Sequence, residues 1–139
     1  MDLLNQAIKI ACKAHDGQVD KGGEPYILHP LRVMLQCETM DERIVAVLHD
    51  AMEDDPEYKV TSFIFDIFTL RITDAILAIT RGHDESYKDY IIRCAKNDLA
   101  LRVKMADLRD NLDMRRRKAL TYLDACSRNV NSEYEDIGA

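Results

Sequence analysis

The chain has 139 residues, a net charge of −6 and 47% apolar residues, and these values bound what it can be. A second domain would have too few residues for a core of its own, so we expect a single domain over residues 1–139. Charged residues make up 32% of the chain and aromatic residues 6%, which favours a helical globule over a β-sandwich or barrel. Because phosphate contacts need clustered Lys and Arg, no nucleic-acid partner is expected for so acidic a chain.

Hydropathy and the spacing of the cysteines indicate the expected cellular location of the protein. No apolar run approaches the ~20 residues that a membrane helix needs, so we expect no membrane partner. The first helix-like segment carries Asp2, Lys9 and Lys13 and therefore lacks the apolar stretch of a signal peptide. The expected location is the cytoplasm. The four cysteines are scattered singly with no CxxC pair, and we expect them to be reduced core residues.

Apolar spacing along the chain predicts an all-α fold, a compact bundle of several helices. Apolar residues recur at steps of three and four from the start of the chain to His15, which is typical of an amphipathic helix. The longest irregular stretch is expected between Gly17 and Pro30, and Pro30 is expected at the first position of the next helix. In chain order, helices are predicted over residues 1–15, 31–36, 41–53, 63–68, 72–82, 86–94, 98–112 and 119–128, with fraying over residues 129–139.

One predicted helix could also be a strand. The segment Leu99–Met105 alternates apolar and polar residues, but its continuation to Leu112 does not. No second strand is available to pair with it, and a lone strand would leave its backbone groups unpaired. A helix from Asp98 to Leu112 is therefore predicted.

The sequence His49-Asp50-Ala-Met-Glu53-Asp54 is the strongest candidate for chemistry. In a helix from Asp41 to Glu53, helical spacing places His49 and Glu53 one turn apart, with Asp50 beside the acidic pair. Carboxylates this close repel one another unless a cation lies among them. An acidic helix surface is the alternative interpretation.

Two further residues complete a set of metal ligands. His29 precedes a proline, and Asp107 stands in the otherwise apolar stretch Val103–Leu108. With His49 and Asp50 they make a set of two imidazoles and two carboxylates, which suits Mn²⁺, Fe²⁺ or Zn²⁺ and leaves positions open for water and substrate oxygens. Only one such set is visible, so we expect one divalent metal ion.

The sequence resembles a family, the HD-domain metal phosphohydrolases. Within this family it is similar to the hydrolase domain of RelA/SpoT-type enzymes and to the stand-alone small alarmone hydrolases. The matching segments lie in the family's order and cover about residues 4–114. They are Ala14–Gln18, Lys21–Pro30, Val47–Asp50 with Glu53-Asp54, and Val103–Asp107 with Asn111.

The resemblance implies a role for each matching residue. It implies that His29, His49, Asp50 and Asp107 bind the metal, which we expect to be Mn²⁺, and that Glu53 and Asp54 orient or deprotonate the attacking water. It also implies that Lys21, Lys104 and Asn111 contact the nucleotide. Tyr26 is expected either to pack or to line the nucleotide pocket. Where the family usually has an arginine before Lys21, this chain has Asp20, so the preferred base is left open between guanine and adenine.

The implied activity is removal of the 3′-pyrophosphate from a guanosine or adenosine alarmone, (p)ppGpp or (p)ppApp. One alternative is a phosphatase acting on another nucleotide, such as the 2′-phosphate of NADPH. The other is a non-catalytic interaction module that keeps the HD fold. The expected partner is a small nucleotide, and a homo-oligomer is kept as an option.

Overall fold

The computed structural model describes residues 2–53, 55 and 57–137, and these residues form helices joined by loops. Within the last helix it describes the backbone, but not the side chains, of residues 114–120 and 129–137. The chain divides into two units, residues 1–107 and residues 108–139. The helices are α1 (Leu3–Ala14), α2 (Leu28–Leu35), α3 (Met40–Leu48), α4 (Lys59–Ile67), α5 (Leu70–Ile79), α6 (Tyr87–Ala95) and α7 (Asp98–Ile137).

The all-α prediction is confirmed for the described residues. Their one β-feature is an isolated antiparallel bridge between Val19 and Pro25. The segment that could have been a strand, Leu99–Met105, is part of α7. None of the described helices is both long enough and apolar enough to cross a lipid bilayer.

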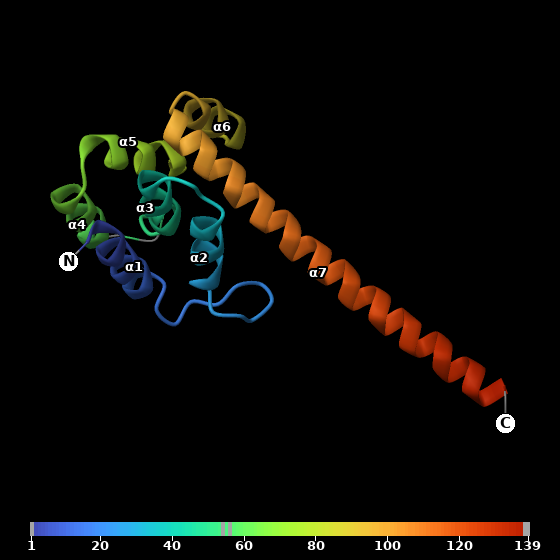
Figure 1. Ribbon diagram of the computed structural model, residues 1–139. Coiled ribbons are helices and arrows are strands. Elements are labelled where there is room, and N and C mark those ends of the chain that lie inside the picture. The colour runs from blue at the N-terminus through green and yellow to red at the C-terminus, as the bar shows by residue number, and fades with distance from the viewer. Residues whose placement is uncertain (1, 54, 56, 138–139) are drawn as a thin grey trace. The chain divides into compact units, whose positions relative to one another are not determined.

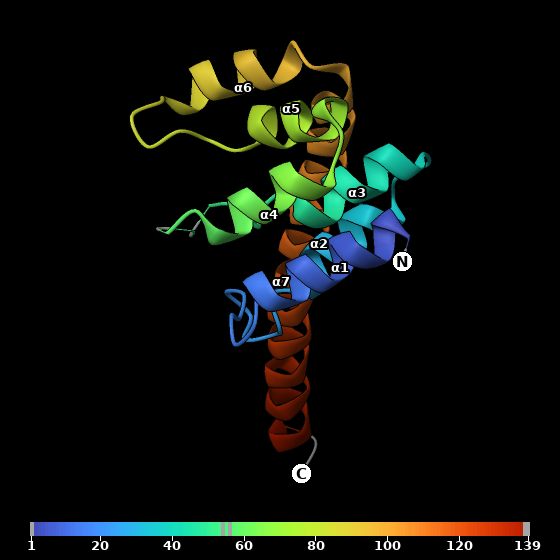
Figure 2. The same ribbon diagram turned by 90° about the vertical axis from the view of Figure 1, so that its left-hand side faces the viewer.

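Helix α3 is the centre of the first unit. It packs against α1, α2 and α5, and α5 in turn packs against α4 and α6 (Figure 1). In Figure 2 α5 lies between α6 and α4. The run from Ile44 to Leu48 is almost completely buried, because α3 is covered on several sides. Such a helix reads as apolar all round rather than amphipathic.

Helix α3 starts and ends at residues that the sequence pattern did not give. Thr39, two residues before the predicted start at Asp41, is the N-cap: its side chain accepts from the backbone of Glu42, and the Glu42 side chain bonds back in a capping box. The predicted helix to Glu53 is wrong, because α3 ends at Leu48 and residues 49–53 form turns with backbone bonds between residues three apart. The carbonyl of Ala46, in the last turn of α3, accepts from both the backbone N–H and the imidazole of His49.

Other helix starts also differ from the prediction. Helix α2 begins at Leu28, so Pro30 is its third residue rather than its first. The position is tolerated because the first-turn N–H groups have no partner inside the helix. Helix α4 begins at Lys59 rather than Phe63, since Asp55 accepts from the backbone of Lys59 and Thr61. The predicted start of a helix at residue 86 is confirmed, with Ser86 as the N-cap of α6.

The second unit consists of the continuation of α7. The prediction of two helices, 98–112 and 119–128, with fraying from residue 129 is wrong for residues up to Ile137, because one helix runs from Asp98 to Ile137. The segment contains no Gly or Pro, and its Arg, Lys, Met and Ala residues are good helix formers, so no residue stops it.

The cysteine prediction holds for half of the set. All four are free thiols, and Cys37 and Cys94 are buried as expected. Cys12 and Cys126 are exposed, so they are not core residues.

Candidate metal centre

The side chains of His29, His49 and Asp50 meet in the first unit, although they come from different elements. His29 lies in the first turn of α2, and His49 and Asp50 directly follow α3. Their ligand atoms all lie within 4.8 Å of one another, which is the spacing of donors around one metal ion. The Oδ2 atom of Asp50 lies 3.1 Å from Nε2 of His49 and 3.8 Å from Nε2 of His29.

Asp107 joins this cluster from α7. Its Oδ1 atom lies 2.9 Å from Nε2 of His29 and 3.5 Å from Nε2 of His49. The backbone that carries it is fixed by packing, because Val103 and Ala106 are buried in the core. The four residues that the sequence predicted as ligands are therefore neighbours, and we call them the His-Asp cluster: His29, His49, Asp50 and Asp107.

The hydrogen bonding of His49 leaves one nitrogen available. Its Nδ1 atom lies 2.6 Å from the carbonyl oxygen of Ala46. A carbonyl oxygen can only accept, so Nδ1 carries the proton and donates it. Nε2 is buried and makes no hydrogen bond within the described residues, although carboxylate oxygens lie close by. A neutral imidazole held by its other nitrogen is the form that binds a metal ion.

The charges in the cluster also favour the binding of a cation. Burial alone would lower the pKa of His49, but the carboxylates of Asp50 and Asp107 outweigh burial and raise it well above its ordinary value. Burial would raise the pKa of Asp50, but His49 outweighs it and lowers that pKa to about 2. The pocket thus favours positive charge among its carboxylates. A divalent cation supplies that charge with ligand types it prefers, so the residues present fit a metal ion.

Lys104 is held by the cluster rather than directed to solvent. Its Nζ atom lies 2.8 Å from Oδ2 of Asp107, the carboxylate oxygen that does not face His29. The same ammonium lies 5.4 Å from the centre of the Tyr90 ring, within the range of a cation–π contact. Lys104 is half-buried, and its pKa is raised because Asp107 outweighs the effect of burial. Its expected nucleotide contact remains a prediction.

Tyr26 is the cluster neighbour whose role the sequence did not reveal. Its hydroxyl donates a hydrogen bond to Oδ2 of Asp50, and its ring lies edge-on to the imidazole of His29. Burial, and then the charge of Asp50, raises the pKa of Tyr26, so the hydroxyl stays protonated and acts as a donor. The only available signal was its position three residues before His29, which says nothing about which carboxylate it would meet.

The acidic pair predicted to act on water is described in part. Glu53 is exposed in the turn after Asp50, and its charge contributes to the raised pKa of Tyr26 behind the larger effects of burial and Asp50. Glu53 thus lies at the edge of the cluster. Asp54 falls outside the described residues.

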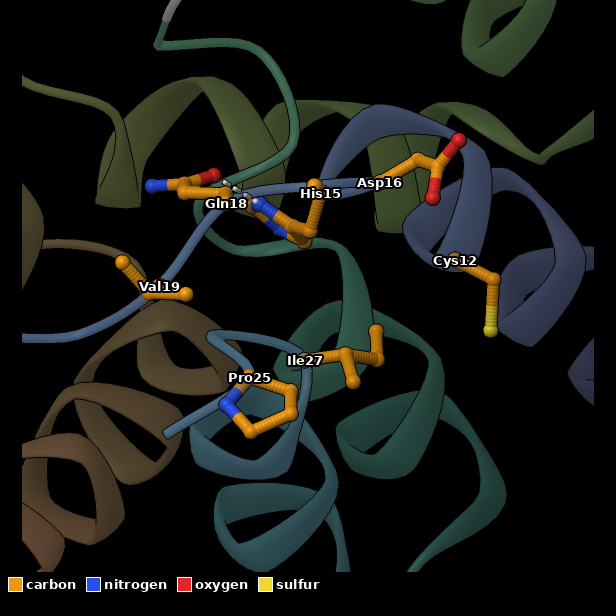
Figure 3. A pocket seen from close by; sticks show the side chains of 8 residues that line it. Cys12, His15, Asp16, Gln18, Val19, Pro25 and Ile27 are labelled. Atoms are coloured by element: carbon orange, nitrogen blue, oxygen red, sulfur yellow. Dashed lines mark hydrogen bonds between the residues drawn. The ribbon is translucent and has the colours of Figure 1, made fainter. Parts of the chain in front are cut away.

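The remaining predicted contacts lie further out. Lys21 is exposed in the turn between Asp20 and Gly23. Asn111 lies on α7 in the second unit, and its contact with a nucleotide stays a prediction. His15, in the matching segment Ala14–Gln18, is buried, and its Nδ1 bonds the Gln18 side chain at 2.9 Å (Figure 3).

Comparison of the sequence with known proteins identifies relatives of this chain. No family model matches the chain. The guanosine-3′,5′-bis(diphosphate) 3′-pyrophosphohydrolase of Aquifex aeolicus is 30% identical over 119 residues, covering 78% of this chain and 17% of that protein. A probable enzyme of the same name from Mycoplasma pneumoniae is 34% identical over 106 residues, covering 72% of this chain and 14% of that protein. The GTP pyrophosphokinase of Myxococcus xanthus is 28% identical over 129 residues, covering 81% of this chain and 17% of that protein.

The chain is homologous to a region of the RelA/SpoT proteins. It spans about a sixth of the length of these curated relatives, 17% in two of them and 14% in the third. The names of these relatives include both synthesis and hydrolysis of guanosine polyphosphates, so the shared region does not by its name alone assign one of the two reactions. The His-Asp cluster within that region is the feature that bears on the choice.

Proposed function

We propose that the chain is a metal-dependent hydrolase that removes the 3′-pyrophosphate of (p)ppGpp or (p)ppApp. The observation that carries the proposal is the convergence of His29, His49, Asp50 and Asp107, with Nε2 of His49 buried and directed at the carboxylates. A divalent ion held by imidazoles and carboxylates can generate a nucleophile from water, which is the chemistry that hydrolysis of a phosphate ester uses.

One divalent metal ion, which we propose to be Mn²⁺, would be held by the four members of the His-Asp cluster. When bound, it supplies a Lewis acid that polarises a phosphoryl oxygen and lowers the pKa of a water molecule. The chain's own contribution is to fix the ligands. The Ala46 carbonyl fixes the ring of His49, and Lys104 holds the far oxygen of Asp107 so that Oδ1 faces His29.

We assign the proton chemistry to the acidic pair after the cluster. Glu53 is exposed at the edge of the cluster, where its carboxylate can take a proton from an attacking water, and Asp54 is proposed as its partner. Lys21 and Asn111 are proposed to bind the phosphates and the nucleoside. Lys104 is proposed to add positive charge beside the leaving group while it remains paired with Asp107.

The base specificity is proposed to be relaxed between guanine and adenine, because Asp20 offers no planar cation on which a purine could stack. The cytoplasmic location and a homo-oligomer also stay predictions. Support for a nucleotide substrate comes from the names of the relatives, which act on guanosine polyphosphates.

The test is a product analysis on the chain loaded with Mn²⁺. We expect ppGpp to yield GDP and pyrophosphate, with ppApp hydrolysed as well, and we expect chelation to stop both reactions. Release of orthophosphate from NADPH, with no pyrophosphate from either alarmone, would support the phosphatase alternative. No product from any of these substrates, with metal bound, would support the non-catalytic alternative.

A further inference from the structure

Between α1 and α2 the chain forms a small hairpin that is held together by its own hydrogen bonds. The backbone of Tyr26 donates to Gln18 at 2.9 Å, and that of Asp20 donates to Glu24 at 2.8 Å. Val19 and Pro25 form the bridge between the two arms. We call residues Gln18–Tyr26 the hairpin.

Asp20 closes the tip of the hairpin. Its Oδ1 atom accepts from the backbone N–H groups of Gly22 at 2.8 Å and Glu24 at 3.0 Å. The turn needs glycine at position 23, where φ is +84°, a value that side chains disfavour. Asp20 is therefore occupied as a turn acceptor, a use of Asp that competes well with other loop conformations.

The rest of the protein gives the hairpin little support on one side. A pocket of about 300 Å³ lies beside it, lined by Val19, Pro25 and Ile27 and, from the end of α1, by Cys12. Figure 3 shows Val19 and Pro25 on one side of this pocket and Cys12 on the other. Because this face is not packed, the shape of the hairpin depends on its internal hydrogen bonds.

The hairpin ends on the His-Asp cluster. Tyr26 is its last residue, and the Tyr26 hydroxyl donates to Oδ2 of Asp50, the oxygen nearest Nε2 of His49. The Tyr26 ring is held by His15, with ring centres 4.9 Å apart, and by His29 at 5.8 Å. Rotation of the Asp50 side chain would break the bond to Tyr26, so the hydroxyl restrains the direction of that carboxylate.

From this geometry we infer that Tyr26 is a positioning residue for Asp50, and that the hairpin closed by Asp20 is what delivers it. The inference rests on the metal site of the proposed function. It gives Asp20 a role in building the site, at the position where the resemblance leads one to expect an arginine. Hydrogen-bond partners of metal ligands typically contribute about 10–100-fold to metal affinity or activity.

Two variant pairs test the inference through Mn²⁺ affinity, measured by titration calorimetry. Tyr26→Phe removes one hydroxyl and keeps the ring contacts, and we expect it to weaken Mn²⁺ binding about 10-fold or more. Tyr58→Phe is the matched control, because Tyr58 is 70% exposed, and wild-type affinity is expected. In Tyr26→Phe we also expect kcat for the alarmone at limiting Mn²⁺ to fall, with KM for the nucleotide little changed.

The second pair isolates the turn. Asp20→Ala and Asp20→Asn remove the same charge, but only the asparagine keeps an oxygen for Gly22 and Glu24. We expect Asp20→Ala to weaken Mn²⁺ binding by less than Tyr26→Phe does, and Asp20→Asn to bind as the wild type. Circular dichroism confirms that each variant is folded before its affinity is compared.

The outcomes separate this inference from the proposed function. Unchanged Mn²⁺ affinity in Tyr26→Phe, or equal affinity in the two Asp20 variants, overturns the inference even if the wild type hydrolyses ppGpp. The expected pattern of affinities supports it even if no alarmone is hydrolysed. A wild-type chain that binds no Mn²⁺ overturns it as well.

Discussion

The first unit contains two polar networks that look alike in composition and differ in how their groups are satisfied. Around Arg93, the guanidinium bonds Glu85 twice, at 2.7 and 2.9 Å, and donates to the carbonyl oxygens of Leu77 and Thr80 at 3.0 and 2.8 Å. Opposite charges are paired there, and the carbonyls at the end of α5 gain donors. This network needs no further ligand.

The His-Asp cluster is arranged differently. Carboxylate oxygens and imidazole nitrogens face one another across 2.9 to 3.8 Å, and Nε2 of His49 is buried with no hydrogen bond to any residue that the structure describes. Buried polar groups are normally paired, and the divalent cation of the proposed function would give these nitrogens and carboxylates a common partner. The two networks therefore differ in whether their buried polar groups have hydrogen-bond partners, and not in how many charged groups lie together.

The largest expected effect comes from removing a ligand. His49→Ala and Asp50→Ala are each expected to abolish Mn²⁺ binding and hydrolysis, because the ligand set is then incomplete. Both variants should remain helical, since the apolar core is untouched. Elemental analysis beside circular dichroism checks this, and retention of one equivalent of metal in both variants would remove these residues from the site.

Glu53→Gln is expected to keep the metal and to lose about 10²–10⁴-fold in kcat, because the amide has no proton-accepting carboxylate. Because Glu53 is exposed, we expect the variant to fold as the wild type does, and a melting curve serves as the control. Steady-state kinetics at saturating Mn²⁺ measure the effect. A wild-type kcat would assign the base to another group.

Lys104→Met removes the positive charge that is paired with Asp107 in the His-Asp cluster. Loss of the ammonium removes one donor from Oδ2 of Asp107, and we expect the metal-free protein to lose about 1–3 kcal/mol of stability. Added Mn²⁺ should then raise the melting temperature more in the variant than in the wild type, because the ion replaces the positive charge that Lys104 supplied. Equal shifts in the two proteins would show that Lys104 does not balance charge in the cluster.

Arg93→Ala tests the other network. Loss of its bonds to Glu85 and the carbonyls is expected to cost about 1–3 kcal/mol in a denaturant titration, with Mn²⁺ affinity unchanged. A weakened metal affinity in a folded variant would mean that the two networks are coupled and that the contrast drawn here is wrong.

The smallest effect concerns pH. Arg93 lowers the pKa of Glu85 to about 2 from an ordinary value of 4.5. A carboxyl with a lowered folded-state pKa contributes stability that is present above pH 4.5 and is lost as the pH falls towards 2. The difference in stability between wild type and Glu85→Gln should therefore shrink over that window. A constant difference would mean that Glu85 is not paired in solution.

The features that depend on local sequence pattern could be predicted from the sequence. Apolar periodicity predicted the helices. The four cluster residues were predicted as two imidazoles and two carboxylates: His49 and Asp50 together in an acidic sequence, His29 before a proline, and Asp107 in an otherwise apolar stretch. The bond from Tyr26 to Asp50 could not be predicted, since it joins residues 24 apart and depends on the hairpin. The end of α3 at Leu48 was missed because helical spacing does not encode the turns over residues 49–53, where the backbone and the side chain of His49 both bond the carbonyl of Ala46. The unbroken α7 was missed because one helix was predicted to end at Leu112 and the next to begin at Ala119, although the residues between them favour helix.

The most direct test of the central claim is an anomalous difference map from crystals of the chain grown with Mn²⁺. The account predicts a single peak bounded by Nε2 of His29, Nε2 of His49 and carboxylate oxygens of Asp50 and Asp107, with Lys104 still on the far oxygen of Asp107. Absence of a peak there in crystals saturated with the ion, or a peak bound only by surface carboxylates, would contradict it.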